Sequence, residues 1–261
     1  MEGHDATTVE VVADGQRGSI TLNRPAKLNP LSTQTLNELV AAARWFDARP
    51  EVKVVVVSGN GRAFSAGADL AAFTDPADGA GAAREAADAG RRMADAVEAM
   101  RAVTIARVHG HCVGGGLVLA AACDLRVAAG SARFSIPEVD LGIPLAWGGI
   151  PRLVREIGPA LTKELVMTCR PFGADEAKTA GFLNRVVPET DLDDEVEHLV
   201  HQLLTKSALT LASTKRHTNA VADGMVATAR SWSDADALVT ALHDSESRKA
   251  AGAYLDRVRR R

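Results

Sequence analysis

The chain has 261 residues, 46% of them hydrophobic and 24% charged, which is the balance of an ordinary soluble globular protein. Its net charge of −3 argues against nucleic acid as a general partner, and no apolar run reaches the length needed to span a membrane. Three widely spaced cysteines and an acidic N-terminal stretch without a signal-peptide core lead us to expect reduced core thiols (Cys112, Cys123 and Cys169) in a cytoplasmic protein.

The first part of the chain alternates short β-branched runs with segments of helical period. Strands are predicted, in chain order, at Thr8 to Ala13, Gly18 to Asn23, Val52 to Ser58, Thr104 to His109, Leu125 to Ala128, Ala132 to Ser135 and Arg185 to Val187. Helices are predicted at Thr33 to Ala48, with Ser32 as the N-cap, and at Arg84 to Met100. Strands that alternate with helices favour right-handed β-α-β crossovers, so we expect an α/β fold.

From about Gly148 onward the pattern is almost wholly helical, with a first break at Gly158-Pro159. Amphipathic helices are predicted near Asp191 to Thr205, Ala208 to Ala222 and Ala227 to His243. The basic end of the chain, residues 256–261, is predicted to be a solvated tail. The sequence therefore predicts an α/β core over residues 1–195, followed by a helical region over residues 196–261.

Three consecutive glycines, Gly114-Gly115-Gly116, follow an apolar strand and open an apolar helix that is predicted to run to about Cys123. A strand, a glycine turn and a helix N-terminus together aim free backbone N–H groups at one point. Glu138 lies twenty residues beyond Val118 of this helix. A donor pocket beside one carboxylate indicates proton transfer next to a carbonyl that becomes an oxyanion.

A second glycine element, residues 58–70, follows the apolar strand that ends at Val57. Small residues around Gly67 would let another backbone N–H point into a pocket. Two such elements, each after a buried strand, predict an oxyanion hole with two donors.

Further short motifs occur in a fixed order along nearly the whole chain. They are Leu22-Asn23-Arg24-Pro25 with Leu28-Asn29, Phe64-Ser65-Ala66-Gly67-Ala68-Asp69-Leu70, Gly110 with Gly114-Gly115-Gly116, Ala122-Cys123-Asp124-Leu125-Arg126, Pro137-Glu138-Val139-Asp140-Leu141-Gly142, and Gly148-Gly149 with Arg152-Leu153. In this order and spacing they resemble the enoyl-CoA hydratase/isomerase (crotonase) superfamily. The resemblance implies an α/β, crotonase-like spiral of β-β-α repeats with a C-terminal helical trimerisation region, in a homotrimer or a hexamer built as a dimer of trimers. It also implies an acyl-CoA thioester substrate, with coenzyme A as part of the substrate and no separate cofactor.

Carried over by position, the resemblance implies that the oxyanion hole consists of the backbone N–H groups of Ala68 and Gly115. Glu138 matches one of the two glutamates of the family's hydratases. In a pocket walled by apolar residues such as Leu141 and Trp147, desolvation should raise its pKa and suit it to shuttle a proton. The alternative is a structural carboxylate that caps a helix after Pro137.

The other hydratase glutamate falls at Val118, which can neither hold a water molecule nor move a proton. This resembles the mitochondrial Δ3,Δ2-enoyl-CoA isomerases, which have an aliphatic residue here and a single glutamate at the Glu138 position. The resemblance therefore favours isomerisation of a double bond by Glu138. One alternative is hydration, with water held by Glu138 and another group such as Asp140. A second alternative is a non-catalytic protein that binds acyl-CoA.

The resemblance also suggests residues around the substrate. Lys27 would contact the phosphates or adenine of coenzyme A, or would be a solvated loop lysine. By position, the adenine and pantetheine would lie against Ala66, Asp69 and Leu70. The acyl pocket would be lined by Val118, Leu141 and Trp147, where Trp147 replaces a small residue of relatives and either reshapes the pocket or packs in the core. No cluster of side chains indicates a metal site.

Overall fold

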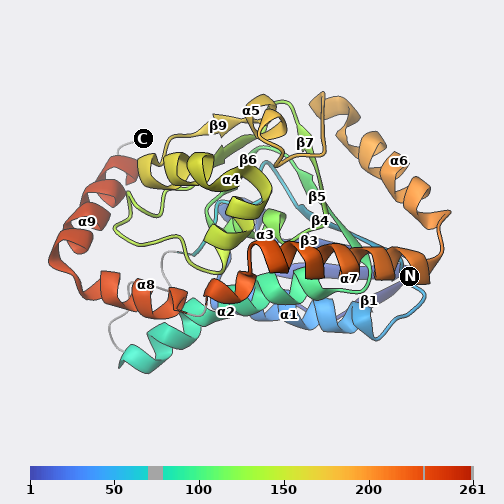
Figure 1. Ribbon diagram of the computed structural model, residues 1–261, viewed down its shortest axis with the longest axis horizontal. Coiled ribbons are helices and arrows are strands. Elements are labelled where there is room, and N and C mark those ends of the chain that lie inside the picture. Colours follow the sequence, from blue (N-terminus) through green and yellow to red (C-terminus); the bar gives the residue numbers. More distant parts are fainter. Residues whose placement is uncertain (70–78, 232, 260–261) are drawn as a thin grey trace.

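The computed structural model of the protein describes residues 1–69, 79–231 and 233–259 (Figure 1). Its strands are β1 (Glu2–His4), β2 (Val9–Asp14), β3 (Arg17–Leu22), β4 (Val54–Gly59), β5 (Val103–Val108), β6 (His111–Val113), β7 (Leu125–Ala129), β8 (Arg133–Ser135), β9 (Phe172–Gly173) and β10 (Arg185–Val187). Its helices are α1 (Thr33–Asp47), α2 (Gly79–Ala99), α3 (Gly115–Ala121), α4 (Gly149–Thr168), α5 (Ala174–Thr179), α6 (Leu192–Leu204), α7 (Ala208–Met225), α8 (Asp234–His243) and α9 (Ser245–Arg259), with 3-10 helices η1 (Pro25–Lys27), η4 (Glu189–Asp191) and η5 (Thr228–Ser231).

Within the described residues the strands form two sheets. The larger sheet has the order β1-β2-β3-β4-β5-β7-β10; its first three strands are antiparallel, and each later pair is parallel. The smaller sheet joins β6, β8 and β9. Parallel pairs need crossover connections, and α1 and α2 supply them on one face of the large sheet. The α/β fold class predicted from the alternating pattern is confirmed.

The central strand β4 is buried on both faces. Val55 and Val57 point into the cluster covered by α1, α2 and α3. Val54 and Val56 point to the opposite face, which α6 covers. Successive side chains of a strand alternate between faces, so a strand covered on both sides is apolar at every position.

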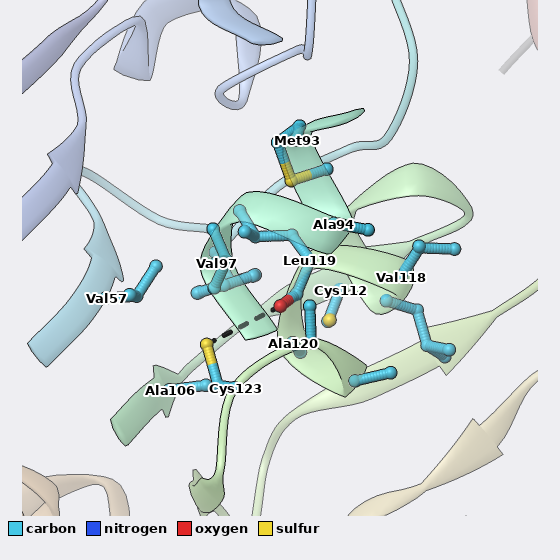
Figure 2. Packing of buried hydrophobic residues seen from close by; sticks show 14 of the residues in the cluster. Val57, Met93, Ala94, Val97, Ala106, Cys112, Val118, Leu119, Ala120 and Cys123 are labelled. Carbon is cyan, nitrogen blue, oxygen red and sulfur yellow. Dashed lines mark hydrogen bonds between the residues drawn. The ribbon is translucent and has the colours of Figure 1, made fainter. Parts of the chain in front are cut away.

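Helices α2 and α3 pack against each other in the larger core cluster (Figure 2), where Met93 and Val97 of α2 lie beside Leu119 of α3. The thiol of Cys123 donates a hydrogen bond to the carbonyl of Leu119 (3.5 Å), and burial raises its pKa to about 12. Burial also raises the pKa of the Cys112 thiol. Cys112 and Cys123 are free and buried, as expected from their apolar surroundings in the sequence, whereas Cys169 is free but only partly buried, so it is not the core thiol that was expected.

The strands predicted from the sequence agree with the structure to within two residues at each end. The Ser32 N-cap is also confirmed, because its hydroxyl accepts a hydrogen bond from the N–H of Thr35 (3.2 Å). Strands β1, β6 and β9, of two or three residues each, were not predicted, although β8 and β10, which also have three residues, were. The break predicted at Gly158-Pro159 is confirmed, because α4 consists of two helical segments that meet at a kink at Gly158, where the backbone is not helical (φ 75°, ψ 164°).

The C-terminal helices differ from prediction in two respects. The segment predicted as one helix, Ala227 to His243, contains η5 and then α8. The basic end is not simply a solvated tail, because α9 continues to Arg259 and Arg257 forms an ion pair with Asp140 (2.7 Å). Helices α8 and α9 lie at one end of the molecule and α6 at the other (Figure 1), while the expected boundary between residues 195 and 196 falls inside α6. Among the described helices, none combines the length and apolarity needed to cross a membrane.

Arg152 of α4 joins that helix to α2 and is 0% exposed. Its guanidinium contacts Asp95 (3.0 Å), Glu98 and the carbonyl of Gly148 (3.2 Å). We expect Arg152→Ala to lower the free energy of unfolding by about 3–5 kcal/mol, because it breaks a buried ion pair and leaves a cavity. Urea denaturation measures this change.

Arg170 provides the matched control, since it also pairs with two carboxylates, Glu164 (2.7 Å) and Glu176 (2.6 Å), but is exposed to water. Arg170→Ala should lower the free energy of unfolding much less than Arg152→Ala does, because water screens an exposed ion pair. Equal losses for the two arginines would show that burial of Arg152 adds nothing to the α2–α4 contact.

Candidate active site

Two backbone turns meet at one side of the large sheet. Ser65 donates its N–H to the carbonyl of His111 (3.0 Å), and Val113 donates to the carbonyl of Ser65 (3.0 Å), which fixes residues 65–69 against the glycine turn. Gly67 has a φ of 92°, and a Cβ built there would lie 2.7 Å from the Val113 carbonyl oxygen and 3.5 Å from the Gly115 nitrogen. Glycine at position 67 is therefore what lets the two turns touch.

The backbone N–H groups of Ala68 and Gly115 are candidate donors at this contact, and both residues line one cavity. Gly115 is the first residue of α3, so its N–H has no partner within the helix. On either side of Ala68, the carbonyl of Gly67 accepts a hydrogen bond from the N–H of Leu31, and the N–H of Asp69 donates to the carbonyl of Leu31. The N–H of Ala68 takes no part in this pairing. Across the described part of the chain, neither N–H group has a protein acceptor. Both predicted oxyanion donors thus occur in one cavity.

Two buried polar side chains hold the first turn in place. The Ser65 hydroxyl donates to the carbonyl of Asn29 (2.8 Å) and accepts from the N–H of Gly67 (3.1 Å). The Asn29 amide donates to the carbonyls of Asn60 (2.8 Å) and Ala63 (2.9 Å). Asn29 and Ser65 are therefore positioning residues. They stand in the quoted motifs, but the motifs alone assign them no role.

Glu138 lies on the turn 138–142 that follows β8. A Cβ on Gly114 would lie 2.4 Å from Glu138 Oε1, so the carboxyl group sits directly against the glycine turn. Its other oxygen, Oε2, is buried and has no hydrogen-bond partner in the described residues. Burial raises the pKa of Glu138 to about 7. The alternative that Glu138 caps a helix is wrong, because residues 138–142 form turns.

The rest of this cavity is apolar. Val118, one helical turn beyond Gly115, is 1% exposed and faces the cavity together with Ile143 and Trp147. Only about 20 Å³ is left for the centre of a water molecule, which is room for about one water. Leu141, which was expected in the acyl pocket, is not among the residues that line this cavity.

Helix α8 supplies a lining residue, Leu238, that the sequence did not suggest. The carboxylate of Asp234, at the start of α8, accepts a hydrogen bond from the N–H of Gly148 (2.8 Å), which holds the helix beside the cavity. The apolar periodicity of 227–243 could have indicated a buried face, but not the surface on which it docks.

Asp140 lies two residues from Glu138 but outside the cavity. Its carboxylate is 44% exposed and pairs with Arg257, and its N–H donates to the Cys169 sulfur (3.3 Å). Asp140 therefore contacts Arg257 and Cys169 at the outside of the loop and does not line the cavity that contains Glu138.

The residues expected to bind coenzyme A lie on adjacent loops. Lys27 is exposed at the end of η1, and the neighbouring carbonyl of Leu28 accepts a hydrogen bond from the N–H of Ala66 (2.8 Å). Asp69 forms an ion pair with Arg24 (3.1 Å). Leu70 lies outside the described residues.

Two candidate N–H donors, a buried carboxyl with a pKa near neutrality and apolar walls define the chemistry of this cavity. The donors can stabilise negative charge on a carbonyl oxygen, and the carboxyl can both accept and return a proton at neutral pH. The only side chain of the cavity lining that titrates, within the described residues, is Glu138.

Comparison with known proteins gives a consistent result. A family model described as enoyl-CoA hydratase/isomerase matches residues 16–260. A probable enoyl-CoA hydratase of Mycobacterium tuberculosis is 36% identical over 212 residues, which cover 81% of each chain. Crotonyl-CoA hydratase of Syntrophomonas wolfei is 38% identical, with 76% of each chain covered. The peroxisomal Delta(3,5)-Delta(2,4)-dienoyl-CoA isomerase of Arabidopsis thaliana is 34% identical, with 80% of each covered.

Solved structures agree with these relatives. The crystal structure of an enoyl-CoA hydratase/isomerase from Mycobacterium paratuberculosis superposes with a TM-score of 0.87 at 27% identity, and covers 96% of this chain and 100% of that one. The fold is therefore that of the crotonases, as the motifs suggested. The family model matches almost the whole length of this chain, and the relatives are more than 30% identical to it. This chain is therefore an enzyme of the enoyl-CoA hydratase/isomerase family.

Proposed function

We propose that this protein is a Δ3,Δ2-enoyl-CoA isomerase, which moves a double bond of an acyl-CoA thioester by a proton shuttle on Glu138. The observation that carries the proposal is the pairing of one buried carboxyl, Glu138, with an apolar residue, Val118, on the facing helix of the same cavity. One carboxyl is sufficient for a reaction that takes and returns one proton.

The reaction begins with the thioester oxygen held by the N–H groups of Ala68 and Gly115. The Glu138 carboxylate removes a proton from C2 of a 3-enoyl thioester, and the electron pair of that C–H bond delocalises onto the thioester oxygen and C4. The protonated Glu138 then returns the proton to C4, which leaves the double bond between C2 and C3. No water molecule is consumed and no group leaves.

Hydration is the second candidate, favoured by the 38% identity to a crotonyl-CoA hydratase. Hydration requires one group that positions a water molecule and a group that delivers the proton of that water to carbon. Two carboxylates share this task in the family's hydratases. Here Val118 stands at the second position, and Asp140 is bound to Arg257 outside the cavity. These contacts favour isomerisation over hydration.

The remaining expectations form part of this proposal. The phosphates, adenine and pantetheine of coenzyme A would lie along Lys27, Ala66, Asp69 and Leu70, and the acyl group against Val118 and Trp147. A homotrimer, or a dimer of trimers, would use the C-terminal helices. In support of assembly, α7 exposes the apolar side chains of Leu209 (77%), Val221 (55%) and Met225 (80%).

The purified protein can be incubated with a 3-enoyl-CoA and, separately, with the 2-enoyl-CoA of equal length, followed by chromatography of the products. We expect conversion of the 3-enoyl to the 2-enoyl ester without 3-hydroxyacyl-CoA. Rapid formation of 3-hydroxyacyl-CoA from the 2-enoyl ester would replace isomerisation with hydration. Binding of both esters without turnover would identify a non-catalytic acyl-CoA binder.

A further inference from the structure

The indole of Trp147 occupies a slot between two helices beside Glu138 and the N–H donors. A Cβ on Gly90 of α2 would lie 2.0–2.2 Å from atoms of the indole, and a Cβ on Gly115 of α3 would lie 2.2 Å from its Cζ3. No side chain fits at either glycine while the indole keeps this place. Trp147 itself is 5% exposed.

The backbone at this point is held in an unfavourable conformation. Trp147 has a φ of 61°, in the left-handed region that bulky residues rarely adopt. Gly90 stands inside α2, where glycine is a poor helix former. The hydrogen bond from Gly148 to Asp234 of α8 fixes the chain directly after Trp147. Strain of this kind persists where the surroundings hold it in place, and it is characteristic of functional sites.

The indole also decides how much of the cavity remains open. It forms one wall of the space that contains Glu138, Ala68 and Gly115, and that space has room for about one water molecule. An acyl chain that extends past the reacting carbons would meet the ring.

We propose that Trp147 is the residue that limits acyl length. Its indole fills the inner end of the acyl pocket between Gly90 and Gly115, so the protein accepts short acyl groups and excludes longer ones. The inference rests on the proposed binding of acyl-CoA, but not on which reaction Glu138 performs. Simple core packing of the indole predicts a different result, namely loss of stability without a change in chain-length preference.

Binding of saturated esters tests this inference without any turnover. Calorimetry would give the Kd of butyryl-, hexanoyl- and octanoyl-CoA for the wild type and for Trp147→Ala. A pocket that buries each added methylene gains about fourfold in affinity per methylene, or about 250-fold from butyryl to octanoyl. We expect no gain with length in the wild type, and in Trp147→Ala a ratio of butyryl to octanoyl Kd that rises at least about tenfold.

Trp45→Ala is the matched control, because Trp45 stacks with Arg49 (3.5 Å) and is not among the residues of the cavity lining. Its chain-length profile should equal that of the wild type. A wild type that gains about fourfold per methylene, or a folded Trp147→Ala with an unchanged profile, would overturn the inference.

Gly90→Ala keeps the test decisive where Trp147→Ala fails to fold. The added methyl would lie 2.0–2.2 Å from atoms of the indole, so the ring, which forms one wall of the cavity, must move, and butyryl-CoA should bind at least about tenfold more weakly with Trp147 intact. Unchanged affinity in this variant would show that the indole is not wedged against the pocket. Failure of every ester to bind the wild type would instead refute the proposed acyl-CoA function.

Discussion

Glu138→Gln should lower kcat for double-bond migration by about 10³-fold while the Kd of a saturated acyl-CoA changes little, since general acid–base catalysis contributes roughly 10²–10⁴-fold. The amide has the size of the carboxyl but can neither take nor return a proton. Steady-state kinetics and calorimetry measure the two quantities. A change of less than tenfold in kcat would remove Glu138 from the mechanism.

The same prediction extends to pH. Because the pKa of Glu138 is raised to about 7, the carboxylate that removes the C2 proton forms only as the pH rises through that value. The kcat/KM of the wild type should therefore increase with pH and level off above about 7, and the Gln variant should lose this dependence. Asp140→Asn is the matched control on the same loop and should keep both the rate and the profile. A large loss in that variant would revive Asp140 as the second group of a hydratase.

The difference in stability between the wild type and Glu138→Gln should also depend on pH. The pKa of Glu138 rises from 4.5 to about 7 on folding, so its favourable contribution is complete below 4.5 and is lost as the pH rises through about 7. A shift of this size corresponds to about 3 kcal/mol. Glu138→Gln should therefore unfold at higher urea than the wild type at about pH 8, and at similar urea at about pH 4. A carboxylate retained for structure would give the opposite order at the higher pH.

Gly115→Ala should lower kcat/KM by about 10²–10³-fold, the range that follows loss of one oxyanion donor. The new Cβ would lie 2.2 Å from the ring of Trp147, so the start of α3 or the indole must move. Either movement displaces the Gly115 N–H from the position of the developing oxyanion. Since the interaction strengthens as charge builds on oxygen, kcat should fall more than the affinity for a saturated ester.

Gly224→Ala is the control for this substitution. Gly224 lies in α7, and a Cβ there meets nothing within 4 Å. This variant should retain the rate of the wild type. If Gly115→Ala retained it too, the donor at residue 115 would play no part in catalysis.

Local sequence signals predicted β2, β3, β4, β5 and β7 of the large sheet because these strands, of five or six residues each, are long enough to show their burial. The four valines of β4 are apolar on both faces, and Arg185 to Val187 was placed to the residue. The start of α2 was placed five residues late, at Arg84, because Ala- and Gly-rich sequence resembles a loop when only composition is read. The position of α9 against the Asp140 loop could not be predicted for a different reason: its contact between Arg257 and Asp140 joins residues that are 117 apart in the sequence.

The residues of the candidate site also fall into two groups, those that the sequence indicated and those that it did not. The two glycine turns and Glu138 could be found in the linear sequence, whereas Ala68, Gly115 and Val118 were assigned by the resemblance to the crotonase family; all four residues line one cavity. Leu238 could not be found, because its role depends on where α8 docks. Gly90 carries no signal of its own either; its significance comes from an indole that approaches from another part of the chain.

The covering of β4, β5 and β7 by α6 has a consequence for the nascent chain. The apolar face that includes Val54, Val56 and Ile105 is complete once Ala129 has been made, yet the helix that covers it begins only at Leu192. At a synthesis rate of about 5–20 residues per second, this face stays open for several seconds on the ribosome. During the same interval the outer edge of β7 is also unpaired, because its partner β10 has not yet been synthesised. An open apolar face beside an unpaired strand edge is a surface on which partly made chains aggregate or bind chaperones. The timing of productive folding is therefore set by the last third of the chain to be translated.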